Sequence, residues 1–144
     1  MSETAGFAHR PEITFDAAQR LMAASCAEAS HRGLTISVAV VDRAGEVVAS
    51  GRMDAAALGT MRLAIDKAYT AAVWQLPSGD LHESSQPGGA DWGLTSTEGG
   101  RIVVYAGGLP IFADGTFAGA IGVSGGTGAE DAECAAAALR AVGL

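Results

Sequence analysis

The chain has few basic residues, few aromatic residues and no long apolar segment. It carries 9 Lys and Arg against 16 Asp and Glu, which gives a formal net charge of −7 at pH 7. Because nucleic-acid binding needs clustered Lys and Arg to neutralise phosphates, this balance argues against a nucleic-acid partner. No apolar run approaches the length that crosses a bilayer, and the N-terminus lacks the pattern of a secretion signal. We therefore expect a cytoplasmic protein without membrane contact.

Cysteine and histidine are also scarce. Cys26 and Cys134 lie far apart in the chain and lack the spacing of a metal site, which favours two reduced thiols. The three histidines are not at ligand spacing either, so we expect no tightly held metal ion. Glycine and alanine, in contrast, are abundant. Small side chains bury little area per residue, so close packing and association of several copies are natural sources of stability.

Hydrophobic periodicity and turn residues predict one α+β domain over residues 13–144, after a flexible tail over residues 1–12. Thr14 is the expected N-cap of the first helix, and Thr127 with Glu130 forms a capping box before the last. Strand hairpins joined in this order form a single antiparallel five-stranded sheet with flanking helices. The helices are expected at 17–31, 55–76 and 129–143, and the strands at 34–42, 46–53, 101–106, 108–113 and 116–124.

Two segments attract a functional interpretation. The middle helix has one stripe of large apolar residues and an opposite face of small residues that bears Lys67. Neither face carries the charges of a solvated surface, so we expect the sheet to cover one and a ligand or partner chain the other. The connection over residues 77–100 is too long for an ordinary loop, which indicates a functional role. It contains His82, Glu83 and Trp92.

Glycines recur inside the predicted strands of the last third of the chain. A glycine within a strand often marks a bend or a close approach of another backbone or a ligand. The alanine-rich final helix can fill much of the space that the glycines leave, so we expect close packing of this helix on the sheet. Backbone amides at its start could hold an anion. Residues Gly107, Gly108, Pro110 and Ser124 are expected to form one wall of a ligand pocket.

Five motifs occur in order between residues 13 and 144: Val40–Gly45, Arg52–Asp54, Ala64–Ala71, Gly107–Ile111 and Gly119–Gly126. On these motifs the chain resembles the GlcG/HbpS family, which includes the C-terminal domain of PduO-type proteins. The resemblance implies a profilin-like sandwich that assembles into homo-oligomers, often octamers. It also implies that some members bind haem or related tetrapyrroles, while others lie in catabolic gene clusters.

The first functional hypothesis is a homo-oligomeric protein that binds haem or another planar small molecule. Arg52 and Lys67 are the candidate anchors for a ligand anion, because both side chains donate hydrogen bonds to carboxylates. Trp74 and Trp92 offer flat apolar surfaces. Haem needs an axial ligand, for which His31 is the candidate.

These residues also have structural interpretations. Lys67 could form a salt bridge across a subunit interface, to Asp66 or Asp131 of a neighbouring copy. Arg52 could pair with an aspartate near its own strand. His31 closes the first helix, where a protonated imidazole is favoured by the helix C-terminus.

The second hypothesis is an enzyme without a redox cofactor: a lyase, isomerase or hydrolase acting on a small carbonyl or carboxylate metabolite of a catabolic pathway. Lys67 or Arg52 would then hold the substrate, and His82 or Glu83 of the long connection would move the proton. A third interpretation is a scaffold whose glycine and alanine faces serve only assembly.

Overall fold

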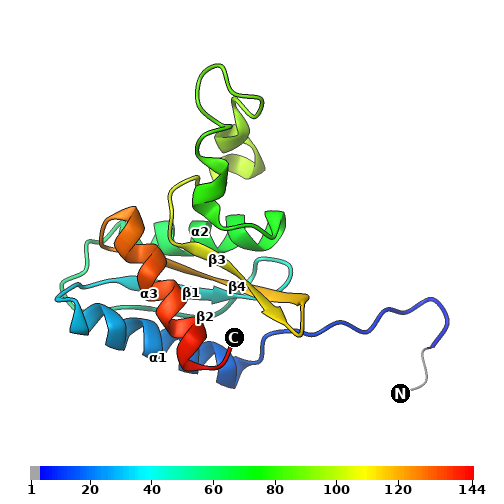
Figure 1. Cartoon of the computed structure of the whole chain (residues 1–144), viewed down its shortest axis with the longest axis horizontal. Coiled ribbons are helices and arrows are strands. Elements are labelled where there is room, and N and C mark those ends of the chain that lie inside the picture. Colours follow the sequence, from blue (N-terminus) through cyan, green and yellow to red (C-terminus); the bar gives the residue numbers. More distant parts are fainter. Residues whose placement is uncertain (1–3) are drawn as a thin grey trace.

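The computed structural model describes residues 4–144, which form three α-helices and one four-stranded antiparallel sheet (Figure 1). The strand order is β2-β1-β4-β3, so the expected α+β class with a single antiparallel sheet is confirmed. Three short 3₁₀ helices lie in the long connection after the second helix. The elements are α1 (Phe15–His31), β1 (Ser37–Val41), β2 (Val47–Arg52), α2 (Thr60–Trp74), η1 (Ser78–Leu81), η2 (Leu94–Ser96), η3 (Glu98–Gly100), β3 (Gly108–Ala113), β4 (Thr116–Ser124) and α3 (Gly128–Ala141).

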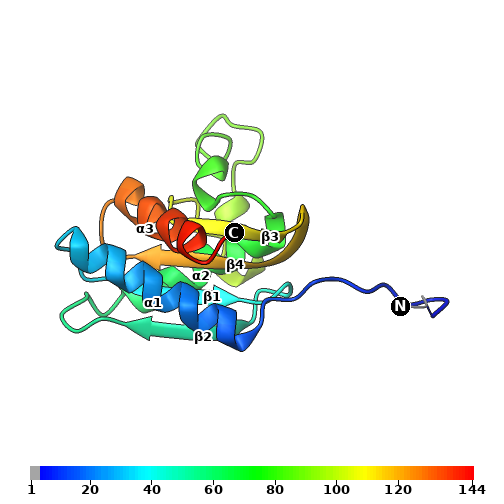
Figure 2. The same cartoon turned by 60° about the horizontal axis from the view of Figure 1, so that its bottom comes forward.

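The helices cover the two faces of the sheet unequally. Helices α1 and α3 pack side by side on one face, and α2 packs alone on the other (Figures 1 and 2). Successive strand residues point to opposite faces, so β1 sends its large side chains Val38 and Val40 toward α1 and α3. It sends Ala39 and Val41 toward the alanines of α2. The face toward α2 therefore carries mostly small side chains, which lets that helix approach closely.

The helix ends follow the expected capping chemistry. Thr14 Oγ1 accepts a hydrogen bond from the Ala17 amide at 3.1 Å. At the start of α3, the Glu130 amide donates to Thr127 Oγ1 at 3.2 Å and the Thr127 amide donates to Glu130 Oε1 at 2.9 Å. Both N-terminal predictions are confirmed. Helix α2 is shorter than expected: it begins at Thr60, and the left-handed backbone of Gln75 (φ 53°) ends it after Trp74.

The prediction of a fifth strand over residues 101–106 is wrong. Backbone groups of this segment bond to side chains of α2 and η1 instead of to a neighbouring strand. The Val103 amide donates to Thr70 Oγ1 at 2.9 Å, and Ser78 Oγ donates to the Tyr105 carbonyl at 2.5 Å. Its alternating apolar residues, Ile102 and Val104, pack against Leu81 and form a small separate core. The alternation thus serves a half-buried extended loop that crosses α2.

The strand glycines make room for α2. The sequence predicted instead that the alanine-rich final helix, α3, fills the space that they leave. A Cβ atom on Gly122 would lie 2.1 Å from the Ala64 carbonyl oxygen, and one on Gly108 would lie 2.2 Å from the Lys67 carbonyl oxygen. Any side chain at these two positions would collide with the backbone of α2. The glycines therefore set the distance between α2 and the sheet.

The described segment before Glu12 extends away from the body of the molecule (Figures 1 and 2), and Glu12 Oε1 already accepts a hydrogen bond from the Arg43 amide at 2.8 Å. The chain joins the sheet at Ile13, whose amide donates to the Ala118 carbonyl at 2.9 Å. Residues 1–3 of the expected tail lie outside the described residues. Within residues 4–144, no helix combines the length and the hydropathy needed to span a bilayer.

Candidate functional site

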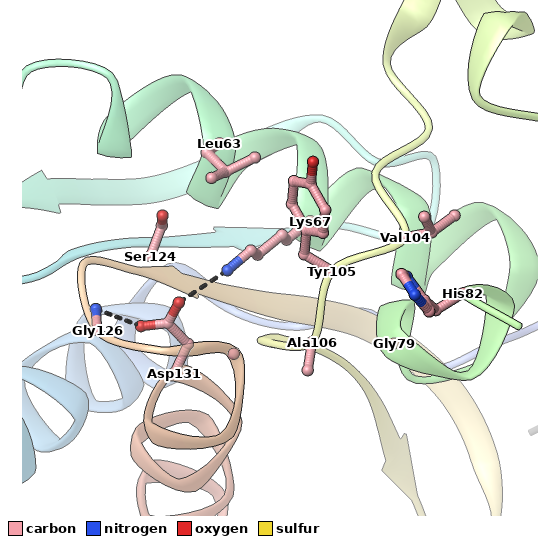
Figure 3. A pocket seen from close by; sticks show the side chains of 11 residues that line it. Leu63, Lys67, Gly79, His82, Val104, Tyr105, Ala106, Ser124, Gly126 and Asp131 are labelled. Atoms are coloured by element: carbon pink, nitrogen blue, oxygen red, sulfur yellow. Dashed lines mark hydrogen bonds and ion pairs between the residues drawn. The ribbon is translucent and has the colours of Figure 1, made fainter. Parts of the chain in front are cut away.

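A cavity of about 460 Å³ lies where β4 ends, between α2 and the first turn of α3 (Figure 3). Leu63 and Lys67 of α2 line it on one side, and Ser124 and Asp131 line it near the start of α3. The loop that crosses α2 closes the cavity with residues 104–106, and His82 lies on the far side from Asp131. The site thus combines groups from four separate parts of the chain.

The floor of the cavity is a buried ion pair. Lys67 Nζ donates to Asp131 Oδ2 at 2.8 Å and to the Val123 carbonyl at 3.0 Å, and both charged residues are only 2% exposed. The Gly126 amide donates to the other oxygen, Asp131 Oδ1, at 2.8 Å. Burial raises the pKa of Asp131, and the hydrogen bonds from Lys67 and Gly126 oppose that rise. The salt bridge expected for Lys67 therefore forms within the chain, whereas the sequence suggested a neighbouring copy.

Gly107 lets this pair form. Helices α2 and α3 lie on opposite faces of the sheet, so Lys67 and Asp131 can meet only at its end. Gly107 lies there with φ of 129°, a conformation that other residues rarely adopt. A Cβ atom on it would lie 2.9 Å from Lys67 Nζ and 3.0 Å from Asp131 Cβ. The predicted wall glycine therefore contributes to the site by its missing side chain.

Ser124 faces the same side of the sheet as α2. Side chains alternate along β4, and Gly122, two residues earlier, lies directly under α2. The Ser124 residue is 3% exposed, lines the cavity and makes no side-chain hydrogen bond with any group in residues 4–144. Ser37 pairs with Ser124 on one side and with Arg52 on the other, so these three residues form a row across the sheet. Arg52 is exposed, lies outside the cavity and makes no ion pair within residues 4–144.

A second cavity, of about 480 Å³, borders the loop segment 102–105 and shares three lining residues with the first. His82, Val104 and Tyr105 line both cavities, and Trp92 lines the second. Four predicted site residues therefore line these two cavities: Lys67, His82, Trp92 and Ser124. Tyr105 was missed because its segment was taken for a strand. Asp131 was named only as a possible partner of Lys67, although the capping box already placed it in the first turn of α3.

The remaining predicted residues lie outside both cavities. His31 is exposed at the end of α1, on the face of the sheet opposite α2. Trp74 is half-exposed at the end of α2, and Glu83 is exposed just after η1. Pro110 lies in β3, the strand at the sheet edge. Residues 4–144 contain no group of three His, Cys, Asp or Glu side chains that could hold a metal ion.

A cluster of charges and one aromatic ring attaches the end of the long connection to α2. Arg101 Nε lies 3.3 Å from Asp66 Oδ1, and its guanidinium carbon lies 3.7 Å from the centre of the Tyr69 ring. The Tyr69 hydroxyl donates to Glu98 Oε2 at 3.0 Å. Burial and the hydrogen bond with Glu98 raise the pKa of Tyr69. These contacts fix the start of the loop segment that lines both cavities.

Comparison with known proteins supports the resemblance seen in the sequence. The family model for "haem degrading protein HbpS-like" matches residues 13–140. The chain belongs to the HbpS-like family. A 15.0 kDa protein of Citrobacter freundii, uncharacterised and named for the dhaT-dhaS intergenic region, is 36% identical over 127 residues, which cover 88% of this chain and 89% of that protein.

Two solved structures share the HbpS-like fold closely. The crystal structure of Klebsiella pneumoniae protein ORFY has a TM-score of 0.94 at 32% identity and covers 99% of both chains. The crystal structure of the PduOC–haem complex has a TM-score of 0.88 at 31% identity, covering 92% of this chain and 96% of that chain. The second of these structures is thus a similar protein solved with haem.

Proposed function

We propose that this chain is a binding protein for haem or a related planar tetrapyrrole, held in the two cavities around His82. The observation that carries the proposal is the shared lining: two cavities border one apolar loop segment, and His82, Val104 and Tyr105 line both. Each volume lies within the range of about 300–1,000 Å³ that is usual for small-molecule sites. The relative solved as a haem complex supports the same ligand class.

The residues present fit the chemical needs of haem. A porphyrin requires apolar or aromatic walls and an iron ligand such as histidine. Leu63 and Val104 supply apolar surface, and Trp92 and Tyr105 supply flat rings. His82 replaces His31 as the candidate axial ligand, because His31 lies on the opposite face of the sheet. Bound haem would supply iron-centred redox and gas-binding chemistry, while these side chains would orient it and exclude water.

Titration with haemin tests this proposal. Wild-type protein should give a saturable shift of the Soret band at micromolar haemin. His82→Ala should weaken binding at least tenfold and change the band position, because the iron loses its protein ligand. His31→Ala is the matched control and should bind like wild type. A wild-type protein that gives no Soret shift would overturn the proposal.

Assembly into a homo-oligomer, with the octamer implied by the family resemblance, belongs to the same proposal. Large apolar side chains are exposed at both ends of α2: Leu58, just before the helix, is 79% exposed, and Val73, Trp74 and Leu76, at its C-terminal end, are each at least 40% exposed. Exposed apolar surface of this kind is typical of sites that bind another protein. Sedimentation should show a particle larger than one chain. Leu58→Glu should shift it to smaller species, and Val47→Glu, an exposed apolar residue of β2, serves as the control.

Acid–base catalysis on a small carbonyl or carboxylate compound is the second candidate function. The observation that favours it is the presence of the Lys67–Asp131 pair and His82 in one cavity. The buried pair would hold the substrate and His82 would move a proton. Incorporation of solvent deuterium into a panel of small carbonyl acids, measured by NMR, tests this. Loss of exchange in His82→Ala would support catalysis, and no exchange with wild-type protein would exclude it for that panel.

A further inference from the structure

We infer that the recess formed by Lys67, Ser124 and the first turn of α3 is a carboxylate-binding subsite. The inference rests on the proposed function, because it assigns the place where the acid group of the proposed ligand binds. The same chemistry could come from a porphyrin propionate or from a free short-chain carboxylate. The recess lies within the first cavity, at the end farthest from His82 (Figure 3).

The Lys67 ammonium retains a hydrogen-bond donor for a ligand. An ammonium group has three N–H donors. Two of them are used within the chain, by Asp131 Oδ2 and by the Val123 carbonyl. Lys67 also lines the cavity, so its third N–H can reach an acceptor only there. The bonds to Asp131 and Val123 thus fix the position of the Lys67 ammonium and leave one N–H donor at the cavity surface.

The Ser124 hydroxyl is the second unused donor. The residue is 97% buried, since only 3% is exposed, and its hydroxyl has no protein partner within residues 4–144. No side-chain oxygen or nitrogen in residues 4–144 is both fully buried and unpaired, so the Ser124 hydroxyl is accessible from the cavity. Because it lies beside Lys67 and the protein does not use it, it is available to a ligand acceptor that enters the cavity.

The first turn of α3 adds backbone donors of the same kind. The Thr127 and Glu130 amides are occupied by the capping box, and the Gly126 amide is occupied by Asp131. Gly128 lines the cavity, and its amide has no acceptor within residues 4–144. The start of a helix also carries a partial positive charge that favours anions.

The charge balance of the recess selects a singly charged acceptor. Both carboxylate oxygens of Asp131 already accept hydrogen bonds, from Lys67 and from Gly126. The ammonium N–H and the backbone amide that remain can only donate, and the Ser124 hydroxyl can donate as well as accept. The Lys67 ammonium at the recess repels a cation. A phosphate would place about two negative charges beside Asp131, whereas a carboxylate brings one.

Comparing haemin with its dimethyl ester tests the porphyrin source. Wild type should bind haemin about tenfold or more tightly than the ester, because hydrogen bonds to a charged group are lost on esterification. Ser124→Ala should reduce this preference and leave the affinity for the ester unchanged. Ser124→Thr keeps the hydroxyl and should restore part of the preference. Ser50→Ala, at an exposed position of β2, is the matched control.

Sodium propionate tests the free-acid source by amide NMR. Saturable shifts of the Gly126 and Gly128 amides in wild type, absent in Ser124→Ala, would support the subsite even if haemin failed to bind. In that case the proposed haem function falls and the subsite stands. If haemin gives a His82-dependent Soret shift, but the ester binds equally well and propionate shifts neither amide, the subsite is overturned and haem binding stands. Equal behaviour of Ser124→Ala and wild type in both arms also overturns it.

Discussion

Replacing Lys67 by methionine tests how much the buried Lys67–Asp131 ion pair contributes to the free energy of unfolding. Methionine keeps most of the volume of the lysine stem but removes the ammonium group. Asp131, 2% exposed, would then retain its hydrogen bond from the Gly126 amide but lose its only counter-charge. Removing one partner of a buried pair costs about 3–5 kcal/mol, because the other charge stays buried without compensation. That is a large share of the roughly 5–15 kcal/mol that stabilises a typical domain.

The cost should depend on pH in a direction that the structure fixes. Burial raises the pKa of Asp131, and the bond from Lys67 opposes that rise, so the variant should have a still higher pKa at this carboxyl. A carboxyl whose pKa is higher in the folded than in the unfolded state destabilises the fold as pH rises above the unfolded value of about 3.9. The penalty of Lys67→Met should therefore be largest at pH 7.5 and smaller at pH 5, because protonation of Asp131 as the pH falls removes the unpaired charge.

Urea unfolding at fixed protein concentration measures the effect at both pH values. Arg62→Met is the matched control, because Arg62 is also paired with an aspartate four residues away but is 72% exposed, and it should cost far less. The double variant Lys67→Met/Asp131→Leu should recover most of the lost stability, since it removes the unpaired charge. A cost for Lys67→Met below about 1 kcal/mol at pH 7.5, or one equal at both pH values, would refute the reasoning.

Three further substitutions test the packing around the site. Gly122→Ala should lower the melting temperature sharply or prevent folding, because its Cβ would lie 2.1 Å from a carbonyl oxygen of α2; Gly59→Ala, with open space around its Cβ position, is the control. Thr127→Ala should cost about 1 kcal/mol in chemical unfolding, because it removes the N-cap of α3. Arg101→Ala should speed amide exchange at Val103 and leave the sheet unchanged, because Arg101 attaches the end of the long connection to α2; unchanged exchange would contradict that role.

Features determined by neighbouring residues could be predicted from the sequence. The Thr14 and Thr127 caps depend on amides three residues away, and both are confirmed. The hairpin between β3 and β4 likewise follows from the Asp114–Gly115 turn. The segment 101–106 shows the limit of such reasoning. Its alternating pattern is typical of a strand, but its backbone partners are side chains about thirty residues earlier in the chain.

The candidate site also depends on contacts between residues that are far apart in the sequence. Lys67 and Asp131 are 64 residues apart, and their meeting requires two helices on opposite faces of a sheet to converge at its end. The pattern of the middle helix predicted that Lys67 lies among small residues, which is correct. It could not show which face the sheet covers. Small residues there meet a glycine-bearing strand, whereas the large apolar stripe stays half-exposed.

The position of Pro110 limits how copies of this chain can associate. Without a fifth strand, β3 is the outermost strand of the sheet, and such strands can recruit the backbone of another molecule. Pro110 lacks an amide proton, and a register irregularity interrupts β3 between Ile111 and Phe112. Both features work against continuous strand addition at this margin. Growth into open, fibre-like stacks through β3 is therefore disfavoured, whatever surfaces copies of this chain use to associate.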